Sequence, residues 1–118
     1  MLTVNIEKAG EINGHTHRCL LADEGQLIAH LEMTIDEEYC EIKKSEGDDA
    51  FWKTDGLVKA AVNYLASKGI RRVGFPSSQA SLDAYFFKQK LTMESNEEIR
   101  SFSVEEFTEN VGCQGGAC

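Results

Sequence analysis

The spacing of apolar residues changes near the middle of the chain, and this change limits the folds available to it. Up to about residue 44, apolar and polar residues alternate, as Leu2, Val4 and Ile6 do between polar neighbours, which is typical of half-buried strands. From Thr54 to Lys68 the apolar residues recur every three or four positions, which is typical of an amphipathic helix. The pattern therefore predicts strands first and helices afterwards.

The elements that this pattern predicts follow one another with short loops between them. The strands are expected at residues 2–8, 15–23, 26–35, 38–44 and 70–75, with a final pair at 91–95 and 97–104. The helices are expected at residues 54–68, 78–90 and 104–110. The first four strands would form an antiparallel meander, and the long helix would lead to a strand parallel to the fourth.

Cap residues mark the expected ends of the two main helices. Thr54 or Asp55 is the expected N-cap of the first helix, and Gly69 is its expected stop. Ser77 or Ser78 is expected to cap the second helix.

Length and composition predict one globular domain at residues 1–111, followed by a flexible Cys- and Gly-containing tail at 112–118. Of the 118 residues, 42% are hydrophobic, which is enough for a core. The sequence has no apolar run of about 18 residues, the length needed to cross a bilayer, and its start lacks the pattern of a secretory signal. We therefore expect a cytoplasmic protein with reduced thiols.

The distribution of charge allows two interpretations. The net charge of −8 argues against a nucleic-acid or anionic-membrane partner, because those surfaces attract a positive face. Residues 43–90 nevertheless hold nine Lys and Arg residues against five Asp and Glu residues, a net charge of +4. These cations are either solvated side chains on two helices or a cationic site for an anionic ligand.

Two stretches, ASKGIRRVGF at 66–75 and AYFFKQKLTM at 84–93, together with the order of the elements, resemble the GNAT-type N-acetyltransferase family over about residues 2–104. The resemblance implies an α/β (α+β) fold with a mixed, mostly antiparallel central sheet and two main helices. It also implies acetyl-CoA as the co-substrate and direct transfer of the acyl group to an amine.

The resemblance further implies how the acyl donor is held. Backbone groups of the strand before the long helix, at Glu41 and the two residues after it, would bind the pantetheine arm. Side chains and free N–H groups at the helix start, over residues 54–57, would bind the pyrophosphate. The residues that would contact the donor are Ile42, Lys43, Lys53, Thr54, Asp55, Gly56 and Leu57.

The stretch DDAFWKTDG, where this helix starts, departs from the family's pyrophosphate loop. Counted back from the helix end, the loop's basic or Gln residue and its two small residues fall on Asp49, Trp52 and Thr54, and none matches. Asp48 and Asp49 would also repel a phosphate. The alternative is an ordinary capped helix with Phe51 and Trp52 packed beneath it.

Three residues are the candidates for proton transfer. Tyr85 lies near the position where the family has a tyrosine that protonates the leaving thiolate, and a core aromatic is the alternative reading. Glu32 and Glu41 lie on the expected meander strands, where either could take the proton of the amine. Exposed strand carboxylates are the alternative for both.

A possible metal-binding pattern lies in the second strand. His15, His17 and Cys19 alternate and would share one face, and His30 or Cys40 on a neighbouring strand could complete a zinc or iron set. Exposed histidines and a small core cysteine are the simpler interpretation, so we expect no bound metal.

The C-terminal stretch GCQGGAC suggests an alternative function. Its glycines would let Cys113 and Cys118 meet in a redox-sensitive disulfide or around a shared metal. We predict a coenzyme A-dependent N-acyltransferase with two small-molecule partners, an acyl donor and an amine acceptor, and allow for a homodimer. The alternative is a non-catalytic relative of the same fold that senses redox state or metal through this tail.

Overall fold

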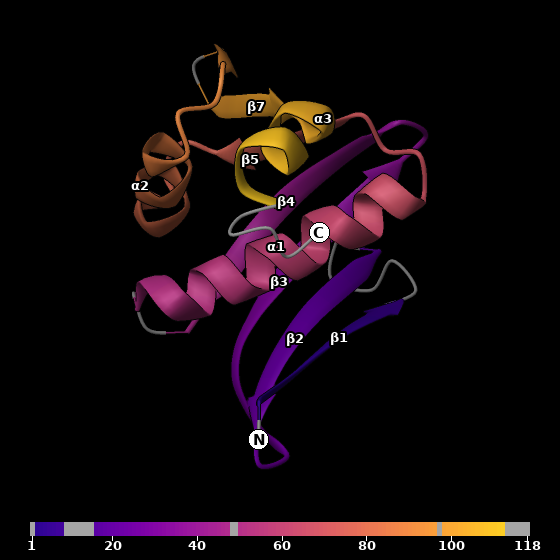
Figure 1. The fold of residues 1–118 in the computed structure, drawn as a ribbon, viewed down its shortest axis with the longest axis vertical. Helices are drawn as coiled ribbons and strands as arrows, with labels where there is room; N and C mark the ends of the chain where they lie inside the picture. Colours follow the sequence, from indigo (N-terminus) through magenta and orange to yellow (C-terminus); the bar gives the residue numbers. More distant parts are fainter. Residues whose placement is uncertain (1, 9–15, 48–49, 97, 113–118) are drawn as a thin grey trace.

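Seven strands form one sheet in the order β1-β2-β3-β4-β5-β7-β6 (Figure 1). The computed structural model describes residues 2–8, 16–47, 50–96 and 98–112. The strands are β1 (Leu2–Lys8), β2 (His17–Asp23), β3 (Gln26–Asp36), β4 (Tyr39–Glu46), β5 (Arg72–Pro76), β6 (Glu94–Ser95) and β7 (Ile99–Ser103). The helices are α1 (Phe51–Ser67), α2 (Ala80–Lys88), α3 (Val104–Phe107) and a π-helical turn at Thr108–Gly112.

The direction of the strands follows the predicted pattern. β1 to β4 form an antiparallel meander, and β4 and β5 run parallel on either side of α1 in the chain. The remaining neighbours, β5 with β7 and β7 with β6, are antiparallel. The predicted mixed, mostly antiparallel sheet with two main helices is confirmed.

Helix α1 lies across one face of the meander and forms the core with it (Figure 1). Its buried side chains are Thr54, Leu57, Val58, Ala61, Val62 and Leu65. The meander residues in the same buried cluster are Cys19, Leu21, Ala29, Leu31, Met33, Cys40 and Ile42. Burial of one large aliphatic side chain contributes about 1.5–3 kcal/mol. The strand face that carries these side chains is therefore more stable when it packs against α1, and this determines which face of each strand is buried.

A cluster of aromatic rings joins the second half of the chain. Phe86 of α2 stacks with Phe75 of β5 at 4.7 Å between ring centroids and lies 4.5 Å from Phe102 of β7. Phe107 of α3 lies 5.8 Å from Phe102. These rings are buried, so they attach α2 and α3 to the sheet.

The start of α1 differs from the prediction. The helix begins at Phe51 with Ala50 as N-cap, and no side chain caps it, so the prediction of Thr54 or Asp55 was wrong. Thr54 is buried inside the helix instead. Phe51 and Trp52 are 47% and 52% exposed, so they do not pack beneath the helix as the alternative reading proposed.

The predicted start of α2 was also wrong, whereas the end of α1 was right. α2 begins at Ala80 after Gln79. Ser77 does not cap it, because its hydroxyl donates to the Glu98 carbonyl at 3.2 Å. Gly69 ends α1 in the left-handed region, with φ of +78°, which a glycine adopts without strain.

No helix within the described ranges is both long enough and apolar enough to span a membrane. His15, Asp48, Asp49, Cys113 and Cys118 lie outside the described residues.

A close contact between β4 and β5 requires a glycine. A Cβ on Gly74 would overlap the hydroxyl of Tyr39 and would lie 3.0 Å from its Cζ. The Tyr39 ring therefore covers the β4–β5 ladder at the place where these strands pair.

We expect Gly74→Ala to lower the free energy of unfolding by about 1–3 kcal/mol, because the added methyl overpacks this contact. Urea unfolding of Gly74→Ala, alone and combined with Tyr39→Ser, measures the coupling between the two positions. The loss of stability caused by Gly74→Ala should be smaller when the Tyr39 ring is absent. Gly56→Ala is the control, since its Cβ would meet nothing within 4 Å. This substitution should stabilise α1 by about 0.5–1 kcal/mol, because alanine favours a helix more than glycine does. Equal effects of the two Gly→Ala changes would contradict the expectation.

Candidate functional site

The pairing of β4 with β5 stops after a short stretch, and this leaves part of β4 open. The paired residues are Tyr39 with Arg72, Cys40 with Val73 and Glu41 with Gly74. On its other side β4 has a bulge at Lys43, because Met33 lies opposite Ile42 while Glu32 lies opposite Lys44. Beyond Glu41, the edge of β4 that faces β5 therefore has no strand partner among the described residues.

The start of α1 offers fewer backbone donors than predicted. The N–H groups of Lys53 and Thr54 donate to the Ala50 carbonyl at 3.1 and 3.3 Å. Residues 54–57 thus lie inside the helix, where their N–H groups are used, and the prediction that these groups are free was wrong. An anion at this helix would meet only the N–H groups of the first turn, which begins at Phe51.

A hydrogen-bonded group joins α1 to α2. The Tyr85 hydroxyl donates to Oδ1 of Asp55 at 2.7 Å, and Nζ of Lys59 pairs with Oδ2 of the same carboxylate at 3.0 Å. The Tyr85 side chain is almost fully buried. Burial and the bond to Asp55 raise the pKa of Tyr85 well above its ordinary value, so its proton stays on the phenol.

Two cavities lie between α1 and α2, and they share Phe51 and Lys88. The first, which we call the α1–α2 cavity, has a volume of about 420 Å³. It is lined by Phe51, Thr54, Ala80, Ser81, Ala84, Tyr85 and Lys88. The second, which we call the lysine cavity, has a volume of about 530 Å³ and is lined by Phe51, Asp55, Lys59, Lys88, Gln89, Lys90 and Asn110.

The structure brings only some of the predicted donor-binding residues to these cavities. Thr54 lines the first and Asp55 the second. Leu57 is buried in the core, so it can offer a ligand no side-chain contact. The ammonium of Lys53 lies over the Trp52 ring, 5.4 Å from its centroid, at the exposed start of α1.

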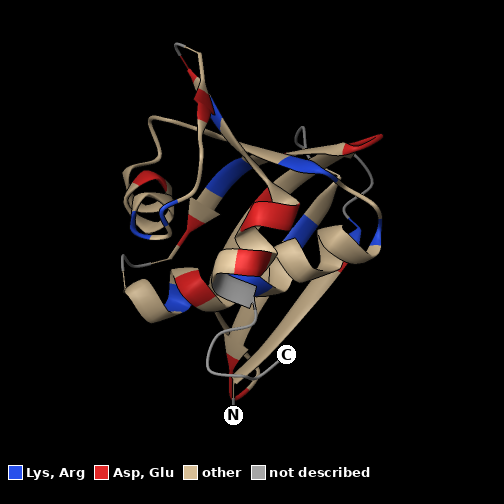
Figure 2. Cartoon of the chain, turned by 45° about the horizontal axis from the view of Figure 1, so that its top comes forward, with Lys and Arg blue, Asp and Glu red and all other residues tan. Residues whose placement is uncertain are grey.

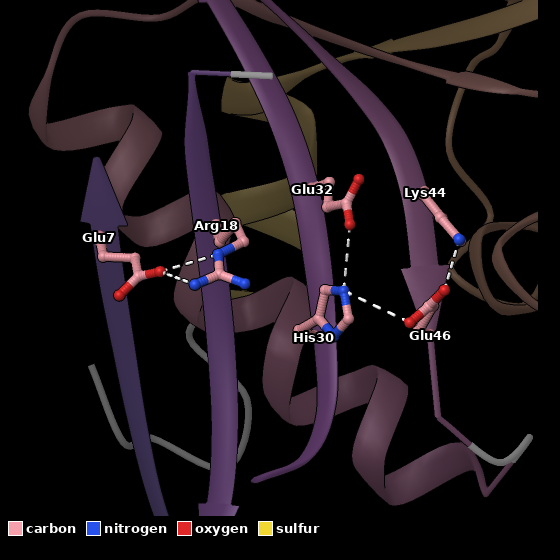
Figure 3. Close-up of polar contacts among 6 residues, drawn as sticks. All are labelled: Glu7, Arg18, His30, Glu32, Lys44 and Glu46. Atoms are coloured by element: carbon pink, nitrogen blue, oxygen red, sulfur yellow. Dashed lines mark hydrogen bonds and ion pairs between the residues drawn. The ribbon is translucent and has the colours of Figure 1, made fainter. Parts of the chain in front are cut away.

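The predicted carboxylate of Glu32 lies on the sheet face opposite α1, in a network of charges (Figure 3). Glu32 accepts from His30 at 3.2 Å, and His30 also lies 3.6 Å from Glu46. Glu41 pairs with Lys43 at 3.0 Å and belongs to the last residue pair of the β4–β5 ladder. Glu41 is therefore next to the open edge of β4, whereas Glu32 is one strand further away.

The remaining residues of the suggested metal set lie on different faces of the sheet. The ring of His17 lies 5.9 Å from that of Tyr64 on α1, and Cys19 is buried beneath the same helix. Burial raises the pKa of the Cys19 and Cys40 thiols to about 12, so neither is a thiolate at neutral pH. His30 faces the other way, with Glu32 and Glu46, so it cannot join them (Figure 3). Across the described residues, no group of three or more His, Cys, Asp and Glu side chains is arranged so that it could hold a metal ion.

Sequence analysis missed most of the residues that line the cavities. Ser81 and Ala84 carry no chemical signal, and their small size matters only because α2 lies beside α1. Lys59, Lys88 and Lys90 belong to the cationic middle of the chain, which was the one available signal.

No protein-family model and no curated protein sequence matches the chain. Many solved structures do, and two that match most of this chain are acetyltransferases. N-acetyltransferase from Staphylococcus aureus Mu50 has a TM-score of 0.66 and 9% identity, over 89% of this chain and 99% of that one. IAA acetyltransferase from Bacillus cereus ATCC 14579 has a TM-score of 0.68 and 10% identity, over 87% of this chain and 99% of that one.

A third similar structure contains a bound ligand. PaiA N-acetyltransferase from Thermoplasma acidophilum, in complex with coenzyme A, has a TM-score of 0.61 and 15% identity, over 73% of this chain and 59% of that one. At such identities these similarities show a shared fold.

Removal of the Asp55 carboxylate should be costly, because it leaves the buried Tyr85 hydroxyl without an acceptor. We expect Asp55→Ala to lower the free energy of unfolding by about 1–3 kcal/mol and Tyr85→Phe by about 0.5–1.5 kcal/mol, measured by urea unfolding. The double variant should lose less than the sum. Asp83→Ala, which breaks only a partly exposed pair with Arg100, is the matched control and should cost about 0–1 kcal/mol. If the double variant lost the full sum of the two single losses of stability, the result would argue against the Tyr85–Asp55 hydrogen bond.

Proposed function

We propose that this chain, which has the GNAT-type acyl-CoA N-acyltransferase fold, binds a coenzyme A thioester and transfers its acyl group to an amine. The observation that carries the proposal is the open edge of β4. It begins after Glu41, where the ladder to β5 ends, and the α1–α2 cavity lies between the helices that precede and follow β5 in the chain. An extended acyl-donor arm suits this arrangement.

The chemistry of the open edge supports an arm of this kind. Unpaired backbone N–H and C=O groups bind extended ligands through main-chain hydrogen bonds, as an added strand does. Pantetheine contains two amide groups, so it can use the backbone of Ile42 and Lys43 without any particular side chain. The α1–α2 cavity lies within the usual size range of small-molecule sites and has polar groups from Thr54, Ser81 and Lys88.

Glu41 is our candidate for the base. In the proposed reaction the amine nitrogen attacks the thioester carbonyl carbon, the C–S bond breaks, and Glu41 takes the proton that the nitrogen loses. Its position at the last β4–β5 pair places it nearer the open edge than Glu32. The negative net charge of the chain would also attract a protonated amine.

The sulfur that leaves needs a proton, which the resemblance assigned to Tyr85. Two observations oppose this assignment, because the hydroxyl proton is donated to Asp55 and burial raises the pKa of the phenol. We propose that Tyr85 holds Asp55 and Lys59 in place and that water supplies the proton.

The two described cysteines bear on the compartment. Cys19 and Cys40 are free, buried thiols, which fits a reducing compartment such as the cytoplasm. We propose small-molecule partners only, acetyl-CoA as the donor, and a homodimer as an assembly to be tested by light scattering.

Isothermal titration with acetyl-CoA tests the donor site. We expect a dissociation constant near the micromolar range, or about −8 kcal/mol. Ala84→Trp should weaken binding at least tenfold, because the indole fills the α1–α2 cavity. Ala66→Trp, on the exposed end of α1, is the control and should leave binding unchanged. If wild type gives no heat up to millimolar acetyl-CoA, the proposed function is wrong.

Thiol release from acetyl-CoA in the presence of a panel of primary amines tests the catalytic assignment. Glu41→Gln should reduce turnover by about 10²–10⁴-fold with donor affinity unchanged, since a positioned base contributes that much. Glu32→Gln and Tyr85→Phe should retain most of the activity. A large loss of turnover in Tyr85→Phe, with normal binding of acetyl-CoA, would show that this tyrosine is the acid. If none of the amines supported thiol release, the result would contradict transfer to an amine.

A further inference from the structure

We propose that Lys59, Lys88 and Lys90 form an anion site in the lysine cavity and hold the nucleotide phosphates of the acyl donor. The inference rests on the proposed function and extends it, because it assigns the phosphates to lysine side chains and not to the backbone at the start of α1. Figure 2 shows Lys and Arg at the end of α2, on the side that faces the first turns of α1.

Two elements bring the lysines together. Phe51, Asp55 and Lys59 are spaced four residues apart on α1, so they lie along one face of the helix. Lys88 and Lys90 lie at the end of α2 and line the opposite wall of the same cavity. Residues about 30 positions apart in the chain therefore place three lysines around a space of about 530 Å³.

The one carboxylate in the cavity wall is already neutralised. Oδ1 of Asp55 accepts from Tyr85 at 2.7 Å, and Oδ2 pairs with Lys59 at 3.0 Å. Asp55 and Lys59 cancel in formal charge, so Lys88 and Lys90 leave the wall with a net charge of +2. This is a local excess of positive charge in a protein whose net charge is −8, and it favours an anion of two or more charges.

The backbone at Lys90 supplies an independent argument. Lys90 follows the C-cap of α2 and has φ of +56°, in the left-handed region where helices usually have glycine. Its N–H donates to the Phe87 carbonyl at 3.3 Å, so the conformation belongs to the helix end. A lysine in this conformation has a higher backbone energy than a glycine would have. Such a cost is expected where the side chain is needed for function.

Phe51 and Lys88 connect the anion site to the donor site. The ammonium of Lys88 lies 5.1 Å from the centroid of the Phe51 ring, and both residues line both cavities. A ligand whose arm lies in the α1–α2 cavity can thus extend past this pair to the lysines. The half-exposed Phe51 ring also offers a flat surface to a nucleotide base.

The site also explains how a phosphate could be held beside a helix start that lacks the family's glycines. The N–H groups of Lys53 and Thr54 are already used, and only the first turn remains for a ligand. Lysine side chains need no close backbone approach, because their long stems carry the charge to the phosphate.

Titration with adenosine 3′,5′-bisphosphate, a nucleotide without a pantetheine arm, tests the anion site by itself. Lys88→Ala and Lys90→Gly should each weaken binding about tenfold, the usual effect of losing one hydrogen bond between charged groups. Both variants should also show a smaller loss of affinity between 50 and 300 mM salt than wild type. Lys68→Ala is the matched control, since Lys68 also lies over an aromatic ring, 5.5 Å from the Tyr64 centroid, at the other end of α1.

Lys90→Gly separates binding from folding. Glycine relieves the left-handed backbone, so the melting temperature of this variant should equal or exceed that of wild type while its affinity falls. Unchanged bisphosphate affinity in Lys88→Ala and Lys90→Gly would overturn the anion site, and so would the absence of bisphosphate binding to wild type.

Acetyl-CoA, titrated in parallel, distinguishes the two proposals. If wild type binds acetyl-CoA and neither lysine variant weakens it, the proposed function survives and the anion site does not. If the bisphosphate binds with the expected lysine dependence but acetyl-CoA binds no better and supports no turnover, the anion site survives and the acyltransfer function does not.

Discussion

The short parallel ladder between β4 and β5 is the constraint on which the rest of the site depends. Its residue pairs end at Glu41 and Gly74, and the bulge at Lys43 bends β4 just beyond them. If the ladder continued, β5 would occupy the backbone groups that an extended ligand needs. The ladder stops instead, and the helices on either side of β5 in the chain, α1 and α2, pack together through the Tyr85–Asp55 bond with the two cavities between them.

The sheet face opposite α1 is covered by charge. Glu7, Arg18, Glu32 and Lys44 lie opposite one another on successive strands, with alternating sign (Figure 3). Such partly exposed pairs contribute little to stability, about 0–1 kcal/mol each. Their importance is that they make a broad sheet face compatible with water.

The sequence predicted the sheet better than the site, for physical reasons. Two-residue alternation places the first four strands within two residues of their observed bounds, because one face of each strand must meet α1. The predicted start of α1 was wrong because Phe51 and Trp52 are exposed, so these apolar residues do not follow the helical spacing of buried positions. The lysine cavity was beyond prediction, since the approach of Lys59 to Lys90 depends on how α2 packs against α1.

Trp52, at the exposed start of α1, gives the molecule an optical property. It is the only tryptophan in the chain, and it directly follows Phe51, which lines both cavities. About half of its surface meets solvent, and the Lys53 ammonium lies over its ring. The fluorescence of the protein therefore comes mainly from one place beside the proposed donor site, so occupancy of that site can be followed in unlabelled protein.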